Sequence, residues 1–149
     1  MARSRINSAS KDLIKDNGAV LISVVEGEQL RMGITLNWVT SLASYTITAK
    51  IVEADMTGSK DEEGYPLSVK SGGVVTTLTT IDDDTSDNKF DIVIPETLIN
   101  SWTTQPTPNS PTYGWIGVEV QDSGINQYKQ IWKPFRGLVE VVYSPSEEV

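Results

Sequence analysis

Apolar and polar residues alternate with a period of two along most of the chain, which is the pattern of half-buried β-strands. The clearest run covers residues 30–38, where apolar side chains are separated by polar residues or glycine. Its apolar members are Leu30, Met32, Ile34, Leu36 and Trp38. A second run, residues 45–51, places Tyr45, Ile47, Ala49 and Ile51 on one face. Its β-branched and aromatic content favours a strand over a helix.

Further strands are predicted along the rest of the chain, separated by turn residues. They cover residues 19–25, 74–81, 90–94, 113–121, 127–135 and 137–143. Residues 95–102 predict a single helical turn that covers one end of a sheet, and no long amphipathic helix is present. Roughly seven to nine short strands with turns between them predict an all-β protein, a single antiparallel β-sandwich.

The two ends of the chain lack the alternating pattern of the predicted strands. Residues 1–17 form a polar arm, extended or with one short helix over 10–16 that turns Leu13 and Ile14 inward. The arm also carries Arg3 and Arg5, so it is locally basic and could reach a neighbouring subunit; the alternative is a frayed terminus. Residues 18–145 form the predicted sandwich, and residues 146–149 form an acidic tail.

The composition excludes several classes of chemistry. The chain of 149 residues contains neither cysteine nor histidine, so it cannot build a disulfide, a zinc finger, a cysteine nucleophile or a Ser-His-Asp triad. Twenty acidic and twelve basic residues give a net charge of −8, which disfavours nucleic acid and anionic membranes as partners. The most apolar early segment, residues 19–25, is too short for a signal peptide or a membrane span. We therefore expect no cofactor and no membrane association.

The acidic run at residues 82–91 is the only local cluster with the character of metal ligands. Alternate oxygen-bearing residues resemble the start of a calcium-binding loop, but Asp87 stands at the position of the turn glycine. Pro95 stands at the position of the closing glutamate. The run is better explained as a solvated hairpin tip, and no metal site is predicted.

Other candidate chemistry is equally weak. Glu119 and Glu140 lie in late strands and alternate outward from apolar neighbours, which fits surface carboxylates better than an acid–base pair. No phosphate-binding glycine motif is present. Residues 128–136 mix aromatic and basic side chains, but three cations on an acidic domain are insufficient for strong binding of nucleic acid. No catalytic residue is predicted.

Contact surfaces are more promising than catalytic sites. Residues 55–73 form a long polar connection with four glycines, here called the excursion, and it contains Tyr65. Trp102 precedes a proline-rich connection, and the alternation places Trp115 on the outside or at a sheet edge. Exposed tryptophans are common interface anchors, although aromatic residues also cover the open ends of sandwiches. Candidate partner contacts are Arg3, Arg5, Leu13, Ile14, Tyr65, Trp102 and Trp115.

The order of these features resembles that of the immunoglobulin-like modules in bacteriophage tail and baseplate proteins, in particular the N-terminal domain of upper-baseplate and fibre-anchoring proteins. The resemblance covers residues 20–145 and rests on structural turns. It is carried by VVEGEQLRMGITLNW (24–38), SLASY (41–45), PETLINSW (95–102), YGWIGVEVQDSG (113–124) and FRGLVEVVYSP (135–145). The residues before Tyr45 depart from the family pattern, and the excursion is longer than expected.

The resemblance implies an immunoglobulin-like sandwich that is a non-enzymatic virion component, present in multiple copies in a symmetric assembly and docked on larger virion proteins. Such a protein would be assembled in the host cytoplasm and reside in the virion. A tail or fibre-attachment adaptor is the preferred hypothesis, and a capsid decoration protein is the structural alternative. A carbohydrate-binding module that uses tryptophans as a platform, and a hydrolase with a carboxylate pair, are hypotheses of other classes.

Overall fold

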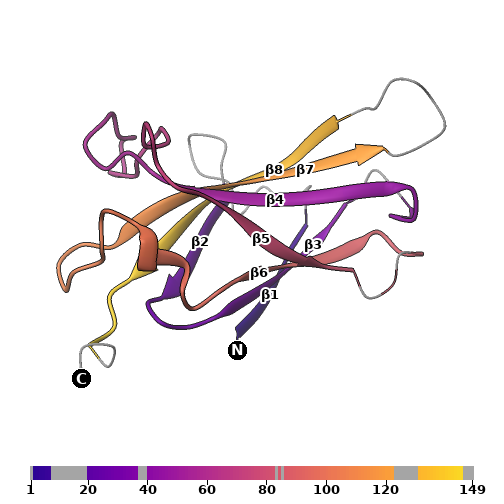
Figure 1. Cartoon of the computed structure of the whole chain (residues 1–149), viewed down its shortest axis with the longest axis horizontal. Coiled ribbons are helices and arrows are strands. Elements are labelled where there is room, and N and C mark those ends of the chain that lie inside the picture. Colours follow the sequence, from indigo (N-terminus) through magenta and orange to yellow (C-terminus); the bar gives the residue numbers. More distant parts are fainter. Residues whose placement is uncertain are drawn as a thin grey trace.

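The computed structural model describes residues 2–7, 20–36, 40–82, 84, 86–122 and 131–145. This part of the chain contains eight β-strands and one short 3₁₀ helix, so the predicted all-β class is confirmed (Figure 1). The strands are β1 (Ala2–Asn7), β2 (Val20–Val25), β3 (Leu30–Thr35), β4 (Tyr45–Glu53), β5 (Val75–Ile81), β6 (Lys89–Ile94), β7 (Thr112–Asp122) and β8 (Ile131–Val142). The 3₁₀ helix is η1 (Leu98–Ser101). No helix in the described residues is long and apolar enough to cross a membrane.

The strands form one continuous sheet that folds into two layers. Its order is β1-β3-β6-β5-β4-β7-β8-β2. β5 joins the layers, because residues 75–78 pair with β4 and residues 79–81 pair with β6. We call the layer of β1, β3 and β6 sheet A and the layer of β4, β7, β8 and β2 sheet B. In Figure 1, β4, β7 and β8 run together on one side, and β1, β3 and β6 lie on the other.

This strand order is that of an immunoglobulin-like sandwich. Matched in chain order, β3, β6 and β5 correspond to strands B, E and D of an immunoglobulin domain, and β4, β7 and β8 correspond to C, F and G. The pairings among β3 to β8 are antiparallel, as predicted, and two further pairings are parallel: β1 with β3 and β2 with β8. Both pairs join strands that are distant enough in sequence for the long connection that parallel pairing requires.

The first part of the predicted arm is extended. β1 is aligned with β3 from Ala2 opposite Leu30 to Asn7 opposite Thr35, so this strand forms one edge of sheet A. The proposed short helix at residues 10–16, with Leu13 and Ile14, lies outside the described residues, as does the acidic tail.

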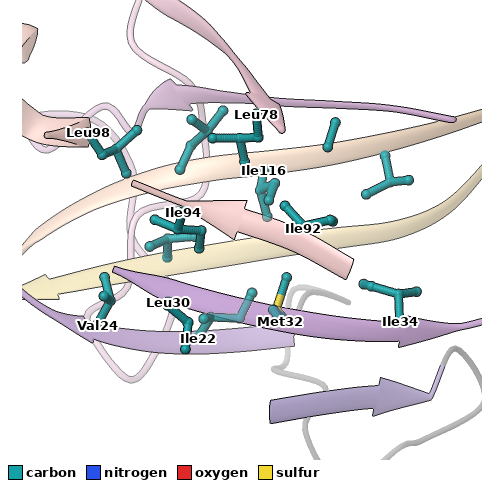
Figure 2. Packing of buried hydrophobic residues seen from close by; sticks show 14 of the residues in the cluster. Ile22, Val24, Leu30, Met32, Ile34, Leu78, Ile92, Ile94, Leu98 and Ile116 are labelled. Atoms are coloured by element: carbon teal, nitrogen blue, oxygen red, sulfur yellow. The ribbon is translucent and has the colours of Figure 1, made fainter. Parts of the chain in front are cut away.

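The main core lies between the two sheets. β3 contributes Leu30, Met32 and Ile34, all buried, and Leu36 follows at 0% exposure, so the predicted inward face of residues 30–36 is confirmed. Trp38, predicted on the same face, lies outside the described residues. Figure 2 shows Leu30, Met32 and Ile34 of β3 among side chains from β2, β5, β6, β7 and η1. The labelled residues are Ile22, Val24, Leu30, Met32, Ile34, Leu78, Ile92, Ile94, Leu98 and Ile116.

One end of the core is covered by η1, as the sequence predicted for residues 95–102. The turn begins with the Leu98 N–H donating to the Pro95 carbonyl at 3.1 Å. Leu98 and Ile99 are buried in the main core cluster. The short helix therefore shields apolar side chains that the sheets leave uncovered at that end.

Candidate functional site

The excursion (residues 55–73) folds back on itself and is held to the end of β4. Ala54 forms an isolated antiparallel bridge with Val69, and Lys60 forms one with Pro66. The Asp55 N–H donates to the Ser68 carbonyl at 2.8 Å, which closes the base of the excursion. Its irregular course agrees with the sequence, but these bonds tie it to the body of the domain.

A second, smaller core lies under the excursion, on the outer face of sheet B. On β7, Tyr113 and Trp115 alternate with the inward residues Gly114 and Ile116, so both aromatic side chains point away from the main core. The buried members of the second core are Ala54, Tyr113, Trp115 and Leu138, and the residues packed on them are Leu21, Val52, Met56 and Tyr65. The excursion therefore covers a sheet face that would otherwise expose aromatic surface to water.

Tyr65 is the aromatic contact between the excursion and β7. Its ring meets that of Tyr113 edge to face, with 5.8 Å between centroids and 87° between planes. This geometry directs the positive edge of one ring at the negative face of the other. Tyr65 is thus placed within the chain's own packing.

A hydrogen-bonded carboxylate joins three strands beside this core. Glu140 on β8 accepts the Tyr113 hydroxyl at 2.9 Å and the Ser23 hydroxyl at 2.7 Å, one on each carboxylate oxygen. Burial raises the pKa of the Tyr113 phenol, and the bond to the Glu140 carboxylate raises it further. The phenol therefore keeps its proton and acts as a donor, so the three residues form a structural clamp across β7, β8 and β2.

Glu53, which the sequence reasoning did not single out, is a second carboxylate clamp. It is 2% exposed at the end of β4. Its Oε1 accepts the Thr103 N–H at 3.0 Å, and its Oε2 accepts the Thr104 N–H at 3.4 Å. The Lys70 ammonium lies 4.0 Å from Oε2. The buried carboxylate thus holds the connection after η1, whereas the end of the excursion is held by the backbone of Glu53, whose carbonyl accepts the Lys70 N–H at 2.8 Å.

Trp102 lies on the other side of sheet B, in the main core. It is 4% exposed, and its ring occupies the space beside the α-carbon of Gly114. The Gln105 side-chain amide donates to the carbonyls of Ile99 and Trp102, at 2.7 and 2.9 Å. The start of the proline-rich connection is therefore fixed against the core.

The residues predicted as partner contacts are not brought together in one site. Trp102 and Trp115 are 4% and 3% exposed, so both pack inside the domain and neither is an exposed anchor. They cannot form the exposed platform that the carbohydrate-binding hypothesis requires. Arg3 and Arg5 lie on the edge strand β1, in register with Arg31 and Gly33 of β3.

A partly buried ion pair joins β3 and β6 in sheet A. Arg31 Nε donates to Asp91 Oδ2 at 2.7 Å, and the side chains are 23% and 4% exposed. Asp91 is directly opposite Gly33 of β3, and Gly33 is in register with Arg5 of β1. Asp91, the last residue of the acidic run, belongs to β6 rather than to the hairpin tip.

The hairpin tip at residues 82–88 uses its polar groups to build turns. Asp84 accepts hydrogen bonds from the Ser86 hydroxyl and from the Ser86 N–H, the latter at 3.0 Å. The bond from the hydroxyl, followed by that from the N–H, lowers the pKa of Asp84. The Asn88 side-chain amide donates to the Leu36 carbonyl at 2.9 Å. Within the described residues, no group of three or more acidic side chains could hold a metal ion.

Replacing Tyr65 by alanine is expected to loosen the excursion. The change removes the edge-to-face contact with Tyr113 and part of the second core, at a cost of about 1.5 kcal/mol in the free energy of unfolding. Limited trypsin digestion should cleave after the exposed Lys60 several-fold faster, while Tyr65→Phe, which keeps the ring, should be cleaved more slowly than the alanine variant. Equal cleavage rates for the two variants would contradict this role.

The pKa of Asp55 provides a second test of the excursion. The Thr57 hydroxyl donates to Asp55 Oδ1 at 2.8 Å, and this bond, followed by that from the Thr57 N–H, holds the Asp55 pKa below 3.8. These bonds favour the charged form, so their small stabilisation is present above the ordinary pKa and is lost as pH falls through the folded value. In Thr57→Val, an NMR titration should show the Asp55 pKa moving up while that of Asp84 stays unchanged.

Comparisons with known proteins give similarity of structure only. No protein-family model matches the chain, and no curated protein matches it. Among solved structures, the N-terminal domain of phage TP901-1 ORF48 is 6% identical, with a TM-score of 0.38 over 97% of this chain and 99% of that chain. Murine CRIg is 9% identical, with a TM-score of 0.33 over 83% of this chain and 92% of that one. Both TM-scores are below 0.5, so neither similarity indicates a function.

Proposed function

We propose that the protein is a non-enzymatic structural subunit of a bacteriophage virion, an adaptor at the tail or at the fibre attachment that docks on larger virion proteins. The sequence resemblance over residues 20–145 to immunoglobulin-like baseplate modules supports this proposal. On this proposal the chain resides in the virion in multiple copies, and its partners are other virion proteins.

The structural observation that carries the proposal is the anchoring of both long connections. Glu53 holds Thr103 and Thr104, and Tyr65 and Tyr113 hold the excursion to sheet B. A sandwich with anchored connections presents rigid surfaces, and a rigid surface docks with a smaller loss of conformational entropy than a mobile one. Glu53 and the Tyr113–Glu140 pair use their polar groups to hold the fold together, which suits a structural protein that provides a rigid docking surface.

The location in the particle can be tested directly. Particles are purified from cells that carry the gene, labelled with gold-conjugated antibodies against the chain and viewed by electron microscopy. We expect label at the tail or at the base of the fibres. Label distributed over the capsid would replace the adaptor with the decoration protein, for which the net charge of −8 provides an acidic surface. Particles without label would overturn the proposal.

The contribution of the basic first strand can be tested in the same particles. We expect the double variant Arg3→Glu/Arg5→Glu to lower incorporation about ten-fold, corresponding to about 1.4 kcal/mol of docking free energy. Lys50→Glu, a reversal at an exposed position on β4, is the matched control and should leave incorporation unchanged. Equal incorporation of all three proteins would remove the first strand from the docking surface.

A further inference from the structure

Among the described residues, β2 (Val20–Val25) is an edge strand of sheet B. In the strand order it stands last, and β8 is its one neighbour among the described residues. An edge strand exposes a row of backbone N–H and C=O groups that can pair with another extended chain. The pairing of β2 with β8 determines which residues supply that row.

The hydrogen bond after β2 fixes the direction of these groups. Glu26 N–H donates to the Val142 carbonyl of β8 at 2.8 Å. Because the backbone groups of successive strand residues point to opposite sides, Val24, Ile22 and Val20 also face β8. The N–H and C=O groups of Leu21, Ser23 and Val25 therefore point to the open edge. The Val25 carbonyl already accepts the Glu28 N–H at 3.0 Å and keeps its second lone pair.

The side chains along this edge lack the usual protection against strand pairing. β2 has the sequence VLISVV, without charge or proline. Val25 and its register partner Val142 are both 38% exposed, so an apolar pair stands at the end of the edge. The strand at the opposite edge of the sheet, β1, is charged, because it carries Arg3 and Arg5. Charged residues on an edge strand discourage pairing with a like strand, and β2 has none.

We propose that β2 pairs antiparallel with β2 of a second copy of this chain, about a two-fold axis at Ser23. In this register Ser23 lies opposite Ser23 of the partner, and Leu21 lies opposite Val25. The three residues whose backbone groups face the open edge then meet the same three residues of the other copy, so the edge is self-complementary as a two-fold interface requires. The exposed Val25 packs beside an apolar side chain, and the two B sheets become one continuous sheet.

The charge of the molecule sets the salt dependence of this contact. Each copy carries a net charge of −8, while the pairing strands themselves are uncharged. Repulsion between the bodies opposes association at low ionic strength and is screened at high ionic strength. Dimerisation is therefore expected to strengthen with salt, opposite to a contact made by ion pairs.

A single cysteine tests the register. In the proposed pairing the two Ser23 residues form a hydrogen-bonded antiparallel pair, with α-carbons about 5.5 Å apart, a spacing that a disulfide accepts. The wild-type chain contains no cysteine, so Ser23→Cys introduces the sole thiol. With oxidised glutathione, the Ser23→Cys protein should form a covalent dimer on a non-reducing gel. Val75→Cys, at a 60% exposed position on β5, is the control and should remain monomeric. A monomeric Ser23→Cys protein, or equal crosslinking of both variants, would overturn the proposal.

Association without a crosslink provides the second test. Analytical ultracentrifugation of the full chain should show a concentration-dependent dimer, and Val25→Lys should raise its dissociation constant about ten-fold or more. Val75→Lys, the same change at an exposed position distant from β2, should leave it unchanged, and circular dichroism should show both variants folded. A wild-type chain that stays monomeric at all concentrations and salt levels would overturn the self-pairing and leave the virion proposal standing.

Discussion

Replacing Gly114 by alanine is expected to lower the free energy of unfolding by about 3 kcal/mol, because the added methyl group collides with a buried ring. A β-carbon built on Gly114 would lie 2.4 Å from Cη2 and 2.9 Å from Cζ2 of Trp102. It would also approach Cδ1 of Ile51 at 3.2 Å. Trp102 and Ile51 belong to the main core, where close packing leaves no free volume into which the indole could move.

Gly117, three residues further along β7, provides the control for this prediction. A β-carbon there meets no atom within 4 Å. Gly117→Ala should therefore change stability by less than about 0.5 kcal/mol, or stabilise slightly by restricting the unfolded chain. Urea unfolding followed by tryptophan fluorescence measures both variants. Equal urea midpoints for the two variants would show that the Trp102 ring can move at little cost, which would contradict its close packing against Gly114.

The inward face of β3 and β4 was predictable from the sequence, because alternation is a local property. The run at residues 45–51 predicts Ala49 and Ile51 on one face, and both are buried at 0% exposure. The same period places Glu53 on that face, so a buried carboxylate could have been expected there. The role of Glu53 as a hydrogen-bond acceptor could not be predicted, because Thr103 and Thr104 are about fifty residues away in sequence and no local pattern indicates where they lie.

Trp115 shows the limit of a prediction based on alternation. The pattern places its side chain on the outer face of sheet B, and the structure agrees. Its burial depends on the excursion, which brings Met56 and Tyr65 over that face. Because the excursion has a polar composition with four glycines, its sequence indicates a loop and gives no sign of what the loop covers.

The direction of the edge strands was unpredictable for a related reason. β1 and β2 read as ordinary extended segments, and their partners β3 and β8 are selected by the three-dimensional course of the chain. The parallel pairing of β2 with β8 is also what leaves Leu21, Ser23 and Val25 facing the open edge. The edge at which we propose self-pairing therefore arises from a non-local contact.

Replacing Glu53 by alanine is expected to lower the free energy of unfolding by about 3 kcal/mol, the second large effect. The variant leaves the N–H groups of Thr103 and Thr104 without their acceptor in a partly buried position. Hydrogen bonds to a carboxylate contribute about 1.5–3 kcal/mol, and removal of the buried Glu53 side chain adds the cost of the cavity that it leaves. Lys70 contributes little, because its ammonium is 4.0 Å away and its side chain is 33% exposed.

Two further variants separate the acceptor role from the charge. Glu53→Gln keeps one carbonyl oxygen toward the Thr103 N–H and should lose about 1 kcal/mol, whereas Glu62→Ala, at an exposed position of the excursion, should lose nothing measurable. Hydrogen exchange locates the effect: in Glu53→Ala the amides of Thr103 and Thr104 should exchange faster, while those of β8 change only with global stability. If Glu53→Ala unfolded at the same urea concentration as Glu62→Ala, the carboxylate would not hold this connection. The fold would then depend on apolar packing around Trp102 to close that end of the sandwich.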